Sequence, residues 1–206
     1  MSQCPIKDMA ASVKQRLLNY AQTNNLDFSA LLTRFAMERL LYRLSKSSYD
    51  QDFYLKGAML FVLWEKNPHR PTKDLDLLFI PQHDRTALER IFKEVCSTAV
   101  DNDGLFFDPT SVTVDEIREA NTYGGLRVKL IGYLAMGRIP LQADVGLGDS
   151  VYPEPEWTEF PPLLEFSPPR VRAYPTETVI AEKFQAIVEL EFSGDSQRQT
   201  QWKAFL

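Results

Sequence analysis

Apolar residues recur at helical spacing in two stretches of the first fifty residues, and this pattern predicts two helices before any strand. Val13, Leu17 and Ala21 mark the first stretch. The second stretch contains Leu31, Leu32, Phe35, Leu40, Leu41 and Leu44. Asp27 or Ser29 is the candidate N-cap of the second helix, because a short polar side chain can accept a hydrogen bond from the first free N–H groups.

Extended and helical patterns alternate through the middle of the chain. Residues 53–55 predict a short extended segment, and the apolar run after it predicts a helix that begins at Gly57 and ends at Asn67-Pro68. Residues 74–80 predict a strand, because an apolar run follows a turn. Residues 84–99 then predict an amphipathic helix.

Strands and turns dominate after residue 101. Residues 111–114 alternate between apolar and polar side chains, and residues 126–134 and 139–145 are two further candidate strands. Most of the prolines lie in residues 152–175, which predicts an extended linker that crosses the surface.

Together these elements predict an α+β fold, with a small mixed sheet, helices against it and flanking helices at both ends. Thr176 is the candidate cap of the final helix, which ends near Leu190. We therefore divide the chain into a core with the N-terminal helices, residues 1–150, and a second part, residues 151–206. The second part comprises the proline-rich linker and the start of a C-terminal helical region.

Composition narrows the class of protein. The 206 residues are 44% hydrophobic, which is enough for one good core, and the net charge of −5 means that any contact with a polyanion requires a local basic patch. The two cysteines have neither CxxC spacing nor a regular pattern, so a zinc site or a disulfide framework is not expected. No stretch approaches the about 18 apolar residues of a membrane span. We expect a soluble protein of the cytoplasm.

Two carboxylates, Asp74 and Asp76, flank one leucine at the start of the strand at residues 74–80. Side chains two apart on a strand share a face, so these two charges repel unless a cation lies between them, and Mg²⁺ takes such oxygens as ligands. Asp144 is at the matching place on the strand at residues 139–145 and completes a trio if the two strands are neighbours. The alternative interpretation of Asp144 is a strand-end aspartate before a turn.

Basic residues and a glycine near these carboxylates suit contacts to phosphate. Gly57 lies at the start of a predicted helix, where free N–H groups favour anions, and Lys56 precedes it. Arg70, Thr72 and Lys73 form a basic turn just before Asp74, although a solvated loop explains them equally well.

Lys183 lies inside the apolar arc of the final predicted helix, together with Phe184, Ile187 and Leu190. A lysine on an inward face must either extend its amine to water or meet an anion, such as a phosphate or the carboxylates. Whether Arg127 on the preceding strand joins the same site depends on strand order. No P-loop and no Gly-x-Ser-x-Gly pattern is present.

Four segments of the chain resemble the nucleotidyltransferase toxins of the AbiEii/AbiGii type, which are the toxin halves of type IV toxin–antitoxin and abortive-infection systems. They are residues 53–61, 70–78, 141–149 and 174–183. The resemblance extends from the N-terminal helices to about Leu190.

The resemblance implies a core like that of DNA polymerase β with a helical C-terminal part, which uses Mg²⁺ and a nucleoside triphosphate. It also implies transfer of the nucleotide to RNA, with tRNA acceptor ends as one such acceptor, and a cognate antitoxin encoded nearby. By position, Asp74 and Asp76 match the metal-binding pair, and Gly57 matches the glycine on the phosphate side. Asp144 matches the third carboxylate, as base or metal ligand, and Lys183 matches the lysine expected on the triphosphate.

Two features of the sequence depart from that family. Ala58 stands where relatives often carry serine or a second glycine, and the segment 194–206 begins like the family's next motif but lacks both of its acids. We expect a truncated chain in which the C-terminal helical part is incomplete. An apolar face left without its usual cover favours a partner protein or a homo-oligomer.

Three hypotheses remain from the sequence. The first is a Mg²⁺-dependent nucleotidyltransferase toxin in which Asp74, Asp76, Asp144 and Lys183 are catalytic. The second is a truncated, catalytically silent protein of the same fold that acts by antitoxin binding or self-association. The third is a phosphohydrolase that uses the same carboxylates.

Overall fold

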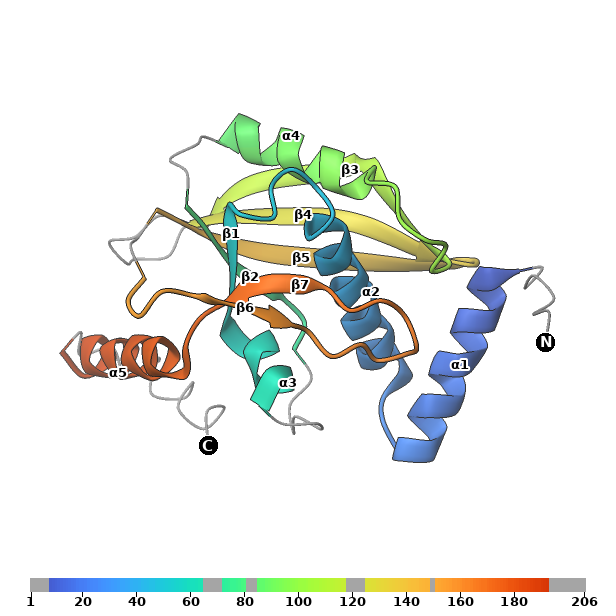
Figure 1. The fold of residues 1–206 in the computed structure, drawn as a ribbon, viewed down its shortest axis with the longest axis horizontal. Coiled ribbons are helices and arrows are strands. Elements are labelled where there is room, and N and C mark those ends of the chain that lie inside the picture. The colour runs from blue at the N-terminus through green and yellow to red at the C-terminus, as the bar shows by residue number, and fades with distance from the viewer. Residues whose placement is uncertain (1–7, 65–71, 81–84, 118–124, 149–150, 193–206) are drawn as a thin grey trace.

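A mixed sheet organises the computed structural model, which describes residues 8–64, 72–80, 85–117, 125–148 and 151–192 (Figure 1). Its seven strands in this part of the chain lie in the order β3-β4-β5-β2-β1-β7-β6. They are β1 (Phe53–Lys56), β2 (Leu75–Phe79), β3 (Leu105–Ile117), β4 (Gly125–Leu134), β5 (Gly137–Leu147), β6 (Glu156–Glu159) and β7 (Arg170–Ala173). The expected α+β class is confirmed.

Strand β2 lies in the middle of the sheet, between β5 and β1. It runs parallel to β5 and antiparallel to β1, and β1 in turn runs parallel to β7. The remaining pairs, β3 with β4, β4 with β5, and β6 with β7, are antiparallel. A central strand has neighbours on both sides, so polar side chains of β2 meet side chains from β5 and β1 at once.

Helices cover one face of this sheet. The α-helices are α1 (Met9–Asn24), α2 (Phe28–Leu44), α3 (Phe61–Trp64), α4 (Arg85–Cys96) and α5 (Thr176–Phe192). Of these, α1, α2 and α4 contact β4, β5 and β3 respectively, and α2 also contacts both α1 and α4. The strand residues beneath them are buried, whereas the alternate residues of β1, β5 and β7 are partly or fully exposed. We call the face that carries these alternate residues the site face.

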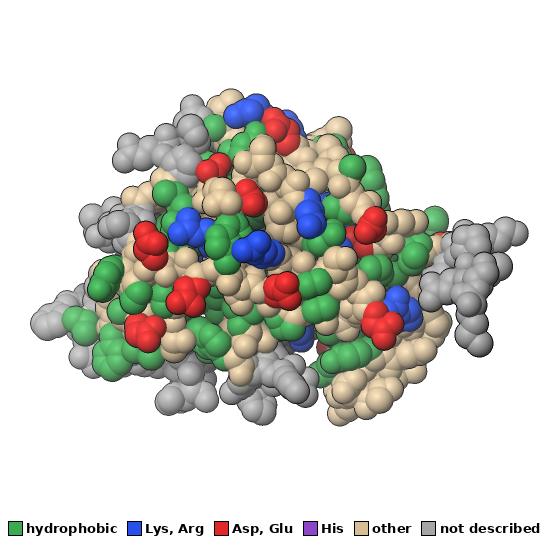
Figure 2. Space-filling view, in the orientation of Figure 1, with side chains coloured by type: hydrophobic (Ala, Val, Ile, Leu, Met, Phe, Trp, Pro, Cys, Tyr) green, Lys and Arg blue, Asp and Glu red, His purple; other side chains and the backbone are tan. Residues whose placement is uncertain are grey.

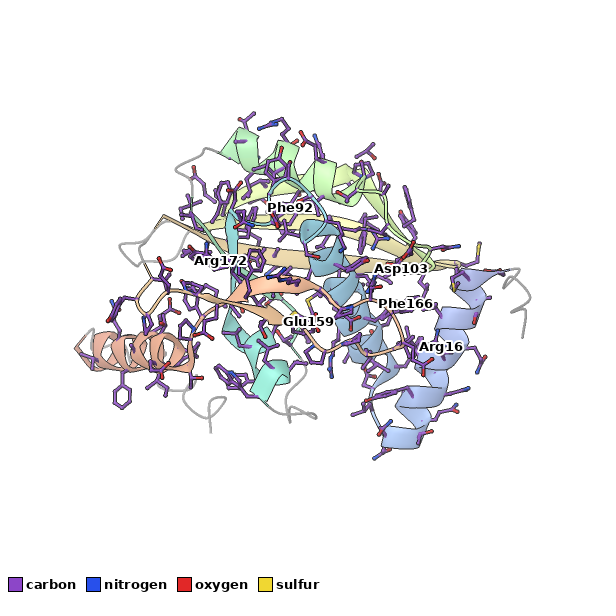
Figure 3. All side chains as sticks on the ribbon, viewed as in Figure 1. Arg16, Phe92, Asp103, Glu159, Phe166 and Arg172 are labelled. Carbon is purple, nitrogen blue, oxygen red and sulfur yellow. The ribbon has the colours of Figure 1, made fainter. Side chains whose placement is uncertain are left out.

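Capping and a buried ion cluster hold α2 in place. Asp27 caps the helix, because its Oδ1 accepts a hydrogen bond of 2.7 Å from the Ala30 N–H, so Asp27 rather than Ser29 is the cap. Near the other end of α2, Arg39 and Arg43 both bind the buried carboxylate of Asp103, at 2.9 and 2.8 Å. Asp103 is labelled in Figure 3. These bonds attach α2 to the segment that enters β3.

The segment after β1 differs from the expected helix. Gly57–Leu60 forms a 3₁₀ turn, and only the single turn α3 is α-helical. The cause is local, since Gly57 adopts a left-handed φ of +68° and the Ala58 N–H donates to the Asp76 carboxylate. The expected end at Asn67-Pro68 lies outside the described residues.

Prolines flank two strands that the sequence pattern did not predict. The expected surface linker at 152–175 contains β6 and β7, which fall in two of its proline-free gaps and extend the sheet beyond residue 150. Proline lacks an N–H for the ladder, so strands avoid it. In the same way, β3 is longer than the expected 111–114, and its register shifts between Asp108 and Thr113, where Pro109 interrupts it.

Helix α5 carries an exposed apolar stripe. Ile180, Phe184 and Val188 are 53%, 64% and 47% exposed, and hydrophobic side chains lie over this helix at the lower left of Figure 2. Within the described part of the chain, no helix combines the length and the apolar character needed to cross a membrane.

Candidate active site

The structure places Asp76 beside Asp144. Strands β2 and β5 are parallel neighbours, and their register aligns these two residues directly. Asp74 precedes β2 by one residue, so its side chain belongs to the same face as that of Asp76. The condition that the sequence left open, adjacency of the two acidic strands, is therefore met.

Asp76 has an environment that favours its protonated form. Burial raises its pKa to about 6, and the nearby charges of Asp144 and Asp74 act in the same direction. The Ala58 N–H and the Lys56 ammonium act in the opposite direction and lower the pKa. A carboxylate perturbed by burial and by like charges is typical of a functional site.

The pKa of Asp74 is also raised, first by burial and then by the charge of Asp144. Arg127 and Lys73 oppose this shift, because both are cations near the carboxylate. Burial and the charge of Asp144 thus disfavour the ionised forms of Asp74 and Asp76, and a divalent cation would favour them.

Arg127 binds Asp144 in a bidentate pair. Its Nε lies 2.8 Å from Oδ1 and its Nη2 lies 2.7 Å from Oδ2, while Gln142 Nε2 lies 3.2 Å from Oδ1. An ionised carboxylate offers about four acceptor positions, so these three bonds leave room for a further ligand on Oδ2. Arg127 therefore acts as the counter-ion of Asp144.

The three acids do not form a ready-made metal cage. Over the described ranges, no group of three or more His, Cys, Asp or Glu side chains is arranged to hold a metal ion. The guanidinium of Arg127 takes one position on each Asp144 oxygen. Asp74 and Asp76 have the hard oxygen donors that suit Mg²⁺. The metal roles of Asp74, Asp76 and Asp144 stay predictions.

Gly57 lies directly against Asp76. A Cβ atom at position 57 would overlap the Asp76 side chain, with Oδ2 as its nearest contact, and the φ of +68° disfavours any residue with a Cβ. Glycine is thus required here by the neighbouring carboxylate and by the backbone. Its predicted contact with a phosphate is not tested by this geometry.

Lys56 connects the site to α5. Its Nζ lies 3.0 Å from Glu182 Oε1 and 5.3 Å from the centroid of the Tyr174 ring, and the residue is in register with Asp76. Its ammonium therefore lies between an acid of α5 and the carboxylates of the sheet. Phosphate binding by Lys56 stays a prediction.

The inward placement expected for Lys183 is wrong in this structure. Lys183 is exposed, and so are its apolar neighbours Ile180 and Phe184. The buried Val179 and the partly buried Glu182 lie opposite Ile180 and Phe184 on α5, with Lys183 between the two sides, and the ion pair of Glu182 with Lys56 fixes that orientation. The helical wheel identified an apolar face, but the sheet contacts a different one.

One residue of the basic turn before Asp74 makes a hydrogen bond to the backbone of that turn. The Thr72 hydroxyl donates to the Asp74 carbonyl at 3.0 Å, which shapes the turn. Lys73 is exposed and lowers the pKa of Asp74. Arg70 lies outside the described residues. The nucleotide contacts expected of all three stay predictions.

A sequence model of one protein family matches most of the chain. The family is described as "Nucleotidyl transferase AbiEii toxin, Type IV TA system", and the match covers residues 39–202. The chain belongs to the AbiEii nucleotidyltransferase toxin family. The matched range contains every residue discussed in this site.

Two solved structures are similar to this chain at low sequence identity. A proposed nucleotidyltransferase from H. pylori is 16% identical with a TM-score of 0.47, and the match covers 77% of this chain and 59% of that one. JHP933 from Helicobacter pylori is 16% identical with a TM-score of 0.45, over 75% and 55% of the two chains. This chain thus covers less than three-fifths of either structure. No curated protein matches it.

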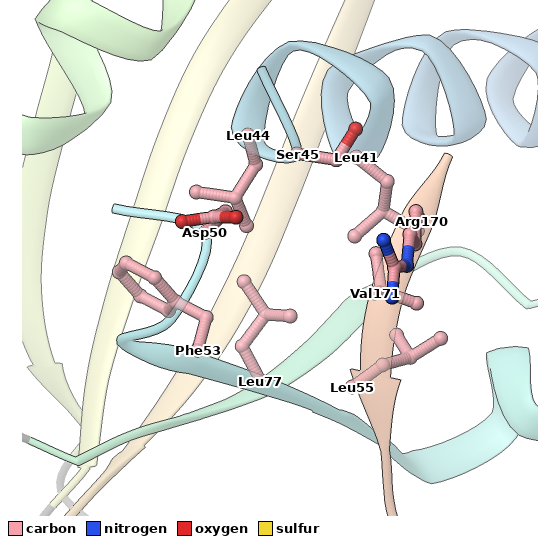
Figure 4. Close-up of a pocket in the computed structure, with 9 residues that line it drawn as sticks. All are labelled: Leu41, Leu44, Ser45, Asp50, Phe53, Leu55, Leu77, Arg170 and Val171. Atoms are coloured by element: carbon pink, nitrogen blue, oxygen red, sulfur yellow. The ribbon is translucent and has the colours of Figure 1, made fainter. Parts of the chain in front are cut away.

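A hollow beneath the sheet is too small to be the substrate site of an AbiEii protein. It lies between α2 and strands β1, β2 and β7, and its volume is about 10 Å³ (Figure 4). Such a volume accommodates one water molecule at most. It is lined by Leu41, Leu44, Ser45, Asp50, Phe53, Leu55, Leu77, Arg170 and Val171. The carboxylates lie elsewhere, on the site face.

Three contributors to this AbiEii site were not assigned from the sequence. Arg127 and Gln142 both bind Asp144, and Glu182 binds Lys56. Arg127 alternates with the buried Leu126 and Val128, so its face was readable, but its partner required the β4–β5 pairing. Glu182 offered no signal, because its partner lies 126 residues away.

Proposed function

We propose that this AbiEii family chain is a Mg²⁺-dependent nucleotidyltransferase toxin, which transfers a nucleotide from a nucleoside triphosphate to an RNA acceptor such as tRNA. The observation that carries the proposal is the register of β2 with β5, which brings Asp74, Asp76 and Asp144 onto one face with raised pKa values at the first two. The family match supports the reaction class.

The residues of the site take distinct roles in this proposal. Asp74 and Asp76 would hold the metal, which would supply charge neutralisation at the transferring phosphate. Asp144, oriented by Arg127, accepts the proton of the acceptor hydroxyl or contributes a further metal ligand. Basic side chains bind the phosphates, and the candidates are Lys56, Lys73 and Lys183, together with Arg70, which lies outside the described residues. The Gly57 turn and Thr72 shape the backbone beside them.

A transfer assay tests this function. The purified chain is incubated with total RNA, Mg²⁺ and each of the four labelled nucleoside triphosphates. We expect label on RNA with at least one nucleotide, and no label when EDTA is added or when Asp74 is replaced by asparagine. Phosphate released without a modified acceptor would favour the phosphohydrolase instead. The absence of both products would contradict the proposal.

Replacing Arg127 with glutamine is expected to lower transfer about tenfold or more, because Asp144 loses its bidentate partner and its orientation. The cost in unfolding free energy is about 1 kcal/mol or less, since the pair is partly exposed. Arg127→Lys keeps the charge but not the fork, so it should recover only part of the rate.

Lys129→Gln is the matched control for this variant. Lys129 lies two residues further along β4 and pairs with Asp115 at 3.1 Å, with both side chains more than half exposed. We expect Lys129→Gln to change neither transfer nor thermal unfolding. Full activity in Arg127→Gln would remove Arg127 from the site.

The exposed stripe on α5 favours a second function. Ile180, Phe184 and Val188 are each about half exposed or more, which suits the binding of an antitoxin or of a second copy of the chain. If the protein acts only by such binding, Asp76→Asn will leave its effect on bacterial growth unchanged. Loss of the growth effect in that variant supports the enzyme instead.

A further inference from the structure

Three cations lie over aromatic rings at one end of the sheet. All the residues involved belong to strands β1, β6 and β7, except one tyrosine that directly follows β7. The pairs are Arg172 with Tyr54, Arg170 with Trp157, and Lys56 with Tyr174. Their distances from the cation to the ring centroid are 4.5, 5.1 and 5.3 Å, in that order. A guanidinium over a ring keeps its N–H edge and its outer face available for a further planar group.

The strand registers place these residues together on the site face. Tyr54 and Trp157 are both in register with Arg172, on either side of it. Arg170 and Lys56 are each two residues from a member of that row, so they share its face. We call Tyr54, Lys56, Trp157, Arg170 and Arg172 the stacking strip. Arg172 lies near the crossing of β7 with β1 in Figure 3.

The stacking strip begins at the carboxylates. Lys56 is in register with Asp76, and Arg170 lies two strands away near the outer edge of the sheet. From strand spacing and rise per residue, the distance from Asp76 to Arg170 is about 16 Å. A flexible chain lying along the strip would therefore have its end at the acids and its next few units over the aromatic pairs.

The outer end of the strip opens into a cleft. Its volume is about 290 Å³, and it is lined by Trp157 and Arg170 of the strip together with Ser45, Lys46, Asp50 and Gln51. Trp157 is 37% exposed, so its ring is accessible from the surface. The cleft thus combines an aromatic surface with two cations and one acid.

The strip itself contains three cations, Lys56, Arg170 and Arg172, and no acid. Within the described residues, the Nε of Arg172 is buried without a hydrogen-bond acceptor, which leaves a donor to be satisfied. Acids border the strip, since Glu159 is in register with Arg170 and Glu182 binds Lys56. Basic side chains gather near the middle of the face that Figure 2 shows, with acidic ones around them. A chain of net charge −5 requires such a local patch to bind a polyanion.

We propose that the stacking strip binds a single-stranded segment of RNA, which it directs with its end toward Asp74, Asp76 and Asp144. This inference rests on the proposed function, because it assigns the acceptor of that reaction a place on the protein. Single-stranded RNA exposes the faces of its bases, which stack on aromatic rings and on guanidinium planes, while its phosphates bind lysine and arginine. A duplex keeps its bases stacked inside and cannot use the rings.

RNA-binding anisotropy without Mg²⁺ and without nucleotide tests the strip apart from catalysis. A fluorescent single-stranded RNA is titrated with the wild type, with Arg170→Gln/Arg172→Gln and with Trp157→Ala, and a duplex of equal length is titrated in parallel. We expect each variant to bind single strands about tenfold more weakly. In the arginine variant, the slope of log affinity against log salt should fall by about 1.4, because two phosphate contacts are lost.

Lys14→Gln/Arg138→Gln is the matched control, because it removes two exposed positive charges away from the strip. It should bind single-stranded RNA like the wild type, and thermal unfolding confirms that every variant is folded. An equal loss in the control, or equal affinity for duplex RNA, would overturn the proposal. Unchanged binding in the strip variants would also overturn the proposal. An acidic protein segment would then be the remaining candidate for the occupant of the strip. If the RNA-binding test fails, the proposal of nucleotide transfer is not affected. If the transfer assay fails, RNA binding by the strip can still be measured.

Discussion

Asparagine in place of Asp76 is expected to lower nucleotide transfer about a thousandfold and, at neutral pH, to stabilise the fold. The loss follows because Asp76 loses its negative charge and one of its two metal-binding oxygens, and a metal contributes several kcal/mol to charge stabilisation in the transition state. The stabilisation follows because burial and the charges of Asp144 and Asp74 disfavour the ionised side chain. Asparagine keeps an oxygen that can accept the Ala58 N–H.

The pH dependence of stability should change in the same variant. The pKa of Asp76 is raised from 3.8 to about 6, so between these values the folded protein binds more protons than the unfolded chain. The wild type therefore loses stability as the pH rises from about 4 to about 6, on the order of 2 kcal/mol from this residue. Denaturant unfolding at several pH values should show this slope in the wild type and a smaller slope in Asp76→Asn.

Asp115→Asn is the control for Asp76→Asn. Asp115 is an exposed acid on β3 that pairs with Lys129, so its loss should leave transfer unchanged. Asp76→Asn with more than a tenth of the wild-type rate would remove Asp76 from the chemistry. A variant less stable than the wild type at pH 7 would contradict the electrostatic account of the site.

Alanine in place of Gly57 is expected to reduce transfer about a hundredfold or more and to destabilise the protein by about 2 kcal/mol. The left-handed φ of +68° disfavours a residue with a Cβ by about 1–2 kcal/mol. The added Cβ also overlaps the Asp76 side chain, so the carboxylate must move. A displacement of about 1 Å in a catalytic group can cost a hundredfold in rate.

Gly104→Ala is the control that separates the effect of backbone strain from the effect on catalysis. Gly104 has a similar φ of +76°, but a Cβ there would lie 2.9 Å from the Ala10 Cα in helix α1, away from the site. We expect Gly104→Ala to lose a comparable amount of stability and to keep its rate of transfer. If both alanine variants lose activity in proportion to stability, Gly57 has no specific role beside Asp76.

The acidic strands were predictable from the sequence because their signal is local. Asp74 and Asp76 precede an apolar run, and Asp144 occupies the same phase on a later strand. Strand period alone sets the face of each side chain. The sequence could not show that β2 and β5 are neighbours, since pairing between residues 68 positions apart has no local cause.

Packing of α5 was not predictable for a different reason. A helical wheel ranks faces by hydrophobicity, and it selected the arc with Phe184, Ile187 and Leu190, in which Lys183 lies. In the structure an ion pair between Lys56 and Glu182 turns another face toward the sheet. The strands β6 and β7 were hidden similarly, because prolines around them resemble a linker while the strands occupy the short gaps.

Calorimetric titration of a Mg²⁺–nucleoside triphosphate complex into the wild type and into Asp76→Asn tests the central claim most directly. We predict saturable binding of at least one of the four nucleotides by the wild type, loss of that binding when Mg²⁺ is omitted, and no detectable binding by Asp76→Asn. Equal binding by both proteins, or no binding of any nucleotide by the wild type, would contradict the account.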